Sequence, residues 1–198
     1  MATKEKLRKF SGLQFLSKQA GSFSGVPQRS VQSWAEKKVV MPDIEDTTGT
    51  GKRRLYSVVN CIELGIVKSL TKKKMPLNVI RECISLLRTE KKLHNILSFW
   101  PSRQGGAKQA GVAHIWEHPL YSPWFLIIYF TDTDDSETPF NFSILIERPW
   151  RNPDRNDVPE LSIAKNIGKF DNLLAIDLIR IAEKVLSKIS SIRLGICM

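Results

Sequence analysis

Apolar residues in the first part of the chain recur at the spacing of short helices separated by turns. Val31 and Trp34 share one face of the segment 27–36, and the other face of that segment is polar. Pro27 suits the first turn of a helix, where its missing N–H costs nothing. We therefore predict a two-sided helix over 27–36. An earlier helix with a turn over 21–25 is expected before it, and its apolar residues are Leu13, Phe15 and Leu16.

A Gly/Thr-rich tip at 47–52 separates two short apolar or aromatic runs, 39–41 and 54–56, which predicts a β-hairpin. Ser57 can cap a helix that follows, and Pro76 can open another. The expected buried faces consist of Val58, Ile62, Ile66 and Leu70 in the first of these helices, and of Val79, Ile80, Cys83, Ile84, Leu86 and Leu87 in the second, which continues toward Leu93 and Leu97.

The segment 101–111 is rich in glycine and predicts a linker. Beyond it, the apolar run 124–130 predicts a strand buried on both faces, and an acidic turn over 132–139 leads to a second strand over 140–147. A helix over 172–191 is expected to cover this hairpin, because a hairpin alone is marginal in water. Its apolar stripe is wide enough to serve a partner helix too, with Val185 and Ile189 as the seam.

Charge divides the chain in the same place. Residues 1–100 carry 19 Lys/Arg against 8 Asp/Glu, whereas residues 101–198 carry 11 against 12, so the net charge of +10 comes from the first half. This asymmetry favours a polyanion as the partner of the first half, with mere solubility as the alternative. Three widely spaced cysteines, a polar start at 1–10 and no long apolar run lead us to expect a cytoplasmic protein without a membrane span.

Two motifs in the first half resemble those of the MerR-type winged helix-turn-helix regulators. The block 24–36, with Gly25-Val26 and Glu36, resembles the turn and recognition helix of that family, and Arg54-Leu55-Tyr56-Ser57 resembles the signature that leaves the wing. The helix pair over 62–80 matches as well, so the resemblance covers about residues 10–88. Gln32, Ser33 and Arg53 depart from the usual residues, and Trp100-Pro101 interrupts the place of the usual dimerising coiled coil.

The resemblance implies a winged helix-turn-helix over 1–100, whereas residues 112–198 resemble no known effector domain. Together with the linker over 101–111 and the strands and helix expected beyond it, this predicts an α+β chain in which 112–198 form a small α+β dimerisation or effector domain. The resemblance also implies double-stranded DNA as the partner. Glutamine and arginine on a helix can read base edges in the major groove, whereas basic wing residues neutralise phosphates. The residues expected to contact DNA are Gln28, Arg29, Ser30, Gln32, Ser33, Lys52, Arg53, Arg54, Tyr56, Lys72 and Lys73. Lys74 completes a run of three lysines, for which the alternative is a solvated loop that does not contact DNA.

Three other patterns point to chemistry less strongly. His114 and His118 fit an H-x-x-E-H zinc motif, but Pro119 argues against the helix that it needs, and in a strand the two histidines would be roughly 13 Å apart. The acidic residues of 132–137 lack the spacing of a calcium loop. The aromatic residues of 100–150 could line a small-molecule pocket, although core packing is the simpler interpretation.

We therefore expect a transcriptional regulator that binds an operator as a homodimer through its C-terminal half. No catalytic residues, metal site or cofactor are expected, and a small-molecule effector is left open. The alternative is an architectural or accessory DNA-binding protein, for recombination or chromosome organisation, which uses the same module without an effector.

Overall fold

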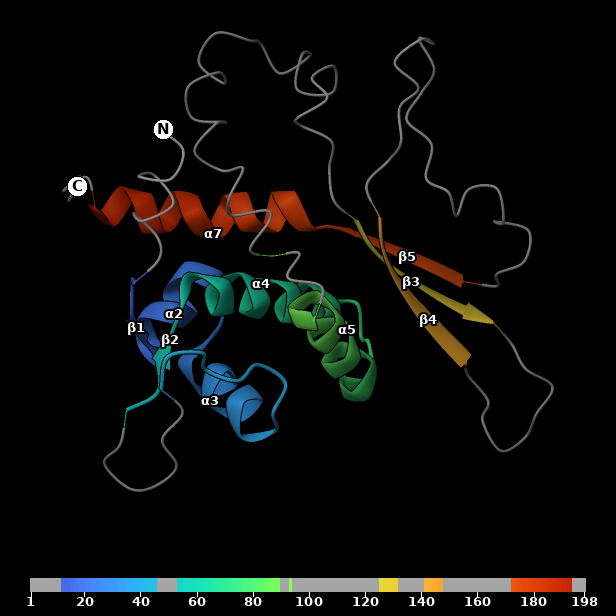
Figure 1. The fold of residues 1–198 in the computed structure, drawn as a ribbon, viewed down its shortest axis with the longest axis horizontal. Helices are drawn as coiled ribbons and strands as arrows, with labels where there is room; N and C mark the ends of the chain where they lie inside the picture. Colours follow the sequence, from blue (N-terminus) through green and yellow to red (C-terminus); the bar gives the residue numbers. More distant parts are fainter. Residues whose placement is uncertain are drawn as a thin grey trace, which may run out of the picture. The chain divides into compact units, whose positions relative to one another are not determined.

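The computed structural model of the chain (Figure 1) describes residues 12–45, 53–89, 93, 125–131, 141–147 and 172–193. The chain divides into two compact units. The first unit comprises Met1–Gly106 together with Arg180–Met198, and the second unit comprises Ala107–Ile179. The sequence had suggested a division after the linker, with all of 112–198 in one domain. In the structure, Arg180–Met198 instead belong to the first unit.

The first unit begins with strand β1 (Phe15–Leu16) and helix α2 (Ser17–Ser24). Phe15 and Leu16 were expected on a helix, but they pair antiparallel with strand β2 (Leu55–Tyr56). Leu16 is extended, and its backbone N–H donates to Oε1 of Gln19 over 3.0 Å, so the helix begins only at Ser17. The ring of Phe15 packs edge-on against Phe23 at 4.9 Å, which places the strand against the helix.

A tight turn joins α2 to helix α3 (Gln28–Glu36) (Figure 1). The expected turn over 21–25 is wrong, because α2 continues through Ser24 and only Gly25 has left-handed backbone, with φ of 69°. Gly21 lies inside the helix, where the carbonyl of Val26 comes close: a Cβ on Gly21 would lie 2.5 Å from that oxygen. The N–H of Val26 donates back to the Gly21 carbonyl over 2.7 Å, which closes the turn. The helix expected over 27–36 is confirmed, with Pro27 just before it.

The segment after α3 is not the strand expected over 39–41. Val39 and Val40 are buried in a turn, and their N–H groups donate to the carbonyl of Trp34. The strand partner of Leu55 on this side is Glu45, through an isolated antiparallel bridge. We call residues Met41–Glu45 the wing root. The tip of the expected wing, 46–52, lies outside the described residues.

Helix α4 (Val58–Lys72) and helix α5 (Leu77–Thr89) follow as expected. Ser57 is the N-cap of α4, and its Oγ accepts from the N–H of Asn60 over 3.1 Å. Every residue from Val58 to Val67 is buried, because α2 and α5 both pack against α4 and a third helix also contacts it.

That third helix is α7 (Leu178–Arg193). A Cβ on Gly65 of α4 would lie 2.9 Å from Cγ2 of Ile181 and 3.5 Å from Cγ2 of Val185, so α7 packs closely where α4 has no side chain. Val185 and Ile189 are 2% and 3% exposed within the single chain. These residues were expected to form a dimer seam, but they are already buried in the first unit. The expectation that they pair two chains is therefore wrong.

The second unit contains a three-stranded antiparallel sheet in the order β4-β3-β5, formed by β3 (Phe125–Thr131), β4 (Asn141–Glu147) and β5 (Asn172–Asp177). The β3–β4 pair confirms the expected hairpin. Leu126, Ile127 and Ile128 are fully buried although their side chains alternate between the faces, which confirms a central strand covered on both sides. Strand β5 was missed, because 172–177 was assigned to the following helix. The expected linker 101–111 lies outside the described residues.

Candidate nucleic-acid interface

Helix α3 presents a polar face of the kind that can lie against DNA. Val31 and Ala35 are buried and fix one side of the helix on the core. Gln28, Arg29 and Gln32 are exposed, while Ser30 and Ser33 are half-buried. The expected two-sided helix is therefore present, and three of its five predicted contact residues are exposed. Trp34 was expected in the core, but the structure leaves it half-buried.

Arg54 connects the end of the wing to α3. Its Nη1 lies 3.5 Å from the carbonyl of Gln32 and 3.7 Å from Oε1 of Glu36, and its side chain is 17% exposed. A guanidinium carries five N–H donors, so both contacts can be made at once. Arg54 thus contacts the helix that carries the predicted base-reading residues, a second role that the sequence did not indicate.

The remaining predicted residues fall in three places. Arg53 is exposed beside the wing, whereas Lys52 lies outside the described residues. Tyr56 is 0% exposed, so its hydroxyl lies in the interior and not on the surface where a phosphate would be met. Lys72 and Lys73 are exposed at the end of α4, where the helix dipole favours cations. Together with the exposed Lys74 we call them the surface lysines.

Two arginines of α5 hold the segment that follows α3. Nη2 of Arg81 donates to the carbonyl of Lys37 over 3.1 Å, just beyond the end of α3. Nη2 of Arg88 donates to the carbonyl of Met41 over 2.7 Å, at the start of the wing root. Helix α5 therefore holds both ends of the connection between α3 and the wing root.

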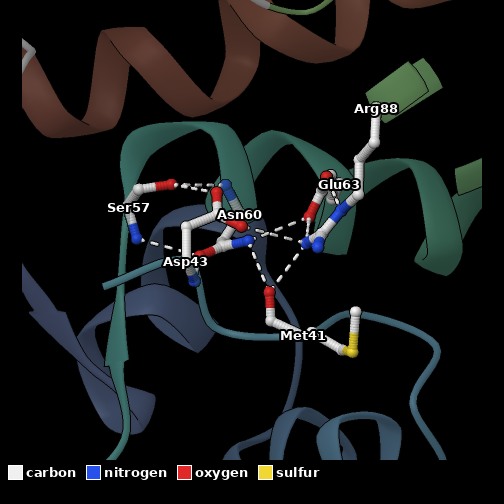
Figure 2. Close-up of polar contacts among 6 residues, drawn as sticks. All are labelled: Met41, Asp43, Ser57, Asn60, Glu63 and Arg88. Atoms are coloured by element: carbon white, nitrogen blue, oxygen red, sulfur yellow. Dashed lines mark hydrogen bonds and ion pairs between the residues drawn. The ribbon is translucent and has the colours of Figure 1, made fainter. Parts of the chain in front are cut away.

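Arg88 belongs to a polar cluster inside the first unit (Figure 2), which we define as Asn60, Glu63 and Arg88. Nε of Arg88 donates to Oε1 of Glu63 over 2.7 Å, and its Nη2 donates to Oε2 over 2.6 Å. Nδ2 of Asn60 donates to the same Oε2 over 2.9 Å and to the carbonyl of Met41 over 3.0 Å. Asn60 and Glu63 are both fully buried, so this cluster carries charge into the interior.

Asp43 connects the cluster to the wing root. Its backbone N–H donates to Oδ1 of Asn60 over 2.9 Å, and its Oδ1 lies 3.3 Å from Nη2 of Arg88. The hydroxyl of Ser57 donates to its Oδ2 over 2.9 Å. Asn60 also accepts from the N–H of Ser57 over 3.1 Å. The wing root and the start of α4 therefore share one hydrogen-bond network.

The electrostatics of Glu63 follow from this position. Burial raises the pKa of Glu63 above its ordinary value, and the hydrogen bonds and charge of Arg88 act in the opposite direction. A buried carboxylate of this kind depends on its partners, because loss of one would leave an uncompensated charge in the interior.

We did not expect a role at this surface for Asn60, Glu63, Arg81 or Arg88 from the sequence. A signal was present for two of them: Asn60 and Glu63 are polar within an otherwise apolar stretch, 58–67, that is buried throughout. Nothing in the spacing of the arginines shows that they reach backbone carbonyls more than 40 positions away.

Metal binding is the other chemistry that the sequence raised. Among the described residues, no group of three or more His, Cys, Asp or Glu side chains could hold a metal ion. His114, His118 and the acidic segment 132–137 lie outside the described part of the chain. No helix in that part is both long and apolar enough to cross a bilayer.

Comparison with known proteins identifies the helix-turn-helix. A family model described as MerR HTH family regulatory protein matches residues 17–87, from the first residue of α2 into α5. Uncharacterized HTH-type transcriptional regulator Mb1861 of Mycobacterium bovis and uncharacterized HTH-type transcriptional regulator Rv1830 of Mycobacterium tuberculosis are each 35% identical to this chain over 69 residues. The match covers 35% of this chain and 31% of each relative, so it spans about a third of the relatives' length. Residues 17–87 of this chain therefore match the MerR helix-turn-helix family, as the sequence motifs had predicted.

Proposed function

We propose that this chain is a transcriptional regulator that binds double-stranded DNA as a homodimer and acts on an operator. The observation that carries the proposal is the exposed face of α3, on which Gln28, Arg29 and Gln32 stand free of the core while Val31 and Ala35 anchor the helix. An α-helix fits the major groove of B-DNA, where glutamine can pair with adenine and arginine with guanine.

The phosphate contacts of the proposal come from basic residues around that face. We assign them to Lys52, Arg53 and Arg54 at the wing and to the surface lysines at the end of α4. Tyr56 is left out because it is buried. The excess positive charge of residues 1–100 supports this assignment, since phosphate neutralisation supplies most non-specific affinity for DNA.

The homodimer follows from symmetry: a protein that reads a palindromic operator needs a twofold partner. The apolar stripe of α7 is buried in its own chain, so the dimer contacts of the proposal lie elsewhere in the C-terminal half. The names of the relatives and of the matched family point to regulation of transcription, which supports binding and not turnover as the activity.

A salt titration tests the proposal. The full chain is first used to select bound duplexes from a random-sequence pool, and the affinity for a selected duplex is then measured between low and moderate salt. With about four to eight phosphate contacts per dimer, log K should fall against log salt with a slope near −4 to −7. A slope near zero would contradict DNA binding altogether. Selection of many loosely related or tandem sites, instead of one palindrome, would favour an architectural role.

A further inference from the structure

The wing root lies between two parts of the proposed interface and is held mainly by side chains from elsewhere. Pro42 has no N–H to donate and disfavours a helical conformation at Met41, so this stretch cannot continue α3. Asn60 and Arg88 both donate to the Met41 carbonyl, and Asn60 accepts from the N–H of Asp43. Consecutive peptide groups on both sides of Pro42 are therefore fixed by two side chains (Figure 2).

Stability alone does not explain why these side chains are polar. The neighbours of Glu63 along α4 are buried and mostly apolar, and a buried ion pair is often no more stabilising than apolar residues of the same volume. What the cluster adds is a fixed orientation of the Arg88 side chain. Arg88 donates to both oxygens of Glu63, and the Nη2 that donates to Glu63 also donates to the Met41 carbonyl. The carboxylate therefore orients the guanidinium toward the wing root.

The two ends of this connection carry the proposed DNA contacts. Upstream of the wing root lies α3 with Arg29, and Glu45 at its far end pairs with Leu55, two positions after Arg53. A displacement of the wing root would therefore move the wing relative to α3, while Val31 and Ala35 would keep α3 itself on the core.

We propose that Asn60, Glu63 and Arg88 are positioning residues that set the angle of the wing against the recognition helix, so that both engage one DNA duplex. This inference rests on the proposed function, because it concerns how the same DNA-binding surface is shaped. None of the three residues contacts DNA in this proposal. They act through the wing root, and their loss uncouples the wing contact from the contact made by α3.

The main variant is Glu63→Gln. The amide keeps the size of the carboxylate but turns one oxygen into a donor, so it can no longer accept from Nε and Nη2 of Arg88 with two separate oxygens as Glu63 does. The matched control is Glu82→Gln, which makes the same chemical change at an exposed position of α5. Asp43→Asn is a milder second variant, since it weakens the 3.3 Å ion pair to Arg88 and keeps the backbone N–H that Asn60 accepts.

A double-mutant cycle in the full chain provides the test. Affinity for a selected duplex is measured with and without Arg53→Ala, which removes a proposed wing contact, and with and without Arg29→Ala, which removes a proposed contact of α3. In the wild-type background, Arg53→Ala should lower affinity about tenfold, because each of the two chains of the proposed homodimer loses one phosphate contact. In the Glu63→Gln background it should lower affinity only about twofold, whereas Arg29→Ala should keep its full effect in both.

The cycle separates positioning from simple destabilisation. A smaller folded fraction would scale all affinities alike and leave both cycles additive. Additive cycles for Glu63→Gln, with wild-type chain that binds the duplex, would overturn the inference and leave the proposed function standing. Failure of the wild-type chain to bind any selected duplex would overturn the proposed function. If circular dichroism shows that Glu63→Gln is unfolded, Asp43→Asn carries the same cycle with the same criteria.

Discussion

Replacement of Val185 by alanine should loosen α7 from the first unit by a calculable amount. Val185 is 2% exposed, and its Cγ2 would lie 3.5 Å from a Cβ built on Gly65, which is van der Waals contact with α4. The change removes two buried methyl groups, each worth about 0.8 kcal/mol, and leaves a small cavity. We therefore expect the free energy of local unfolding to fall by about 2 kcal/mol. Lys184→Ala, at the neighbouring exposed position, should change it by less than about 0.5 kcal/mol.

Hydrogen exchange on α4 is the direct assay, because α4 provides the surface that α7 covers. If exchange reports the opening equilibrium, 2 kcal/mol corresponds to roughly 30-fold faster exchange of the α4 amides in Val185→Ala. Peptides within 58–72 that exchange at the wild-type rate in this variant would refute the packing of α7 on α4.

The burial of Val185 and Ile189 also predicts the effect of a stronger substitution. Val185→Asp combined with Ile189→Asp places two unpaired carboxylates in the first unit, so the expected result is loss of helical circular dichroism. A folded monomer, detected by sedimentation, would instead restore the dimer seam that the apolar stripe of α7 suggested.

Three further predictions concern the helix-turn-helix and its core. Gly21→Ala should destabilise the first unit by about 1–3 kcal/mol in thermal unfolding, because its Cβ would lie 2.5 Å from a backbone oxygen; a stabilised variant would contradict this close approach. Arg54→Ala should weaken binding to selected and random duplexes alike, whereas Arg29→Ala should cost about 1–3 kcal/mol on the selected duplex alone; equal losses for Arg29→Ala would remove α3 from the major groove. Burial raises the pKa of Cys83 to about 12 and raises that of Cys61 further, so a thiol reagent at neutral pH should label their peptides only as the chain unfolds; rapid native labelling by mass spectrometry would show that these sites open.

The sequence predicted the parts of the first unit that follow local rules. Ser57 as N-cap, Pro27 before α3 and the polar face of α3 are set by the chemistry of a few neighbouring positions. The turn after α2 was misplaced because Gly21 was interpreted as a helix breaker. In the structure Gly21 is helical, and its missing side chain admits the carbonyl of Val26, which is a tertiary contact that composition does not reveal.

The supports of the candidate interface could not be predicted, for a different reason. Arg81 and Arg88 bind carbonyls of residues far upstream, and a backbone acceptor has no sequence signature of its own. Glu63 carried a partial signal, since a charged residue inside a buried apolar stretch requires a partner. Its partner Arg88 lies 25 positions later, and only the packing of α5 on α4 brings the two together.

Strand β5 and helix α7 show two features that hydrophobic periodicity does not predict: the boundary between a strand and the helix after it, and the surface that buries the helix. Residues Leu173 to Ile176 extend the apolar pattern of the helix that follows, so a strand and a helix joined at Asp177 without a turn were taken as one helix. The stripe of α7 correctly indicated burial of Ala182, Val185 and Ile189, but not the surface that buries them. Apolar burial is non-directional, so a partner chain, the sheet and α4 would all satisfy the same pattern. The deciding feature is on the other helix: Gly65 leaves a gap in α4, and that gap receives Ile181 and Val185.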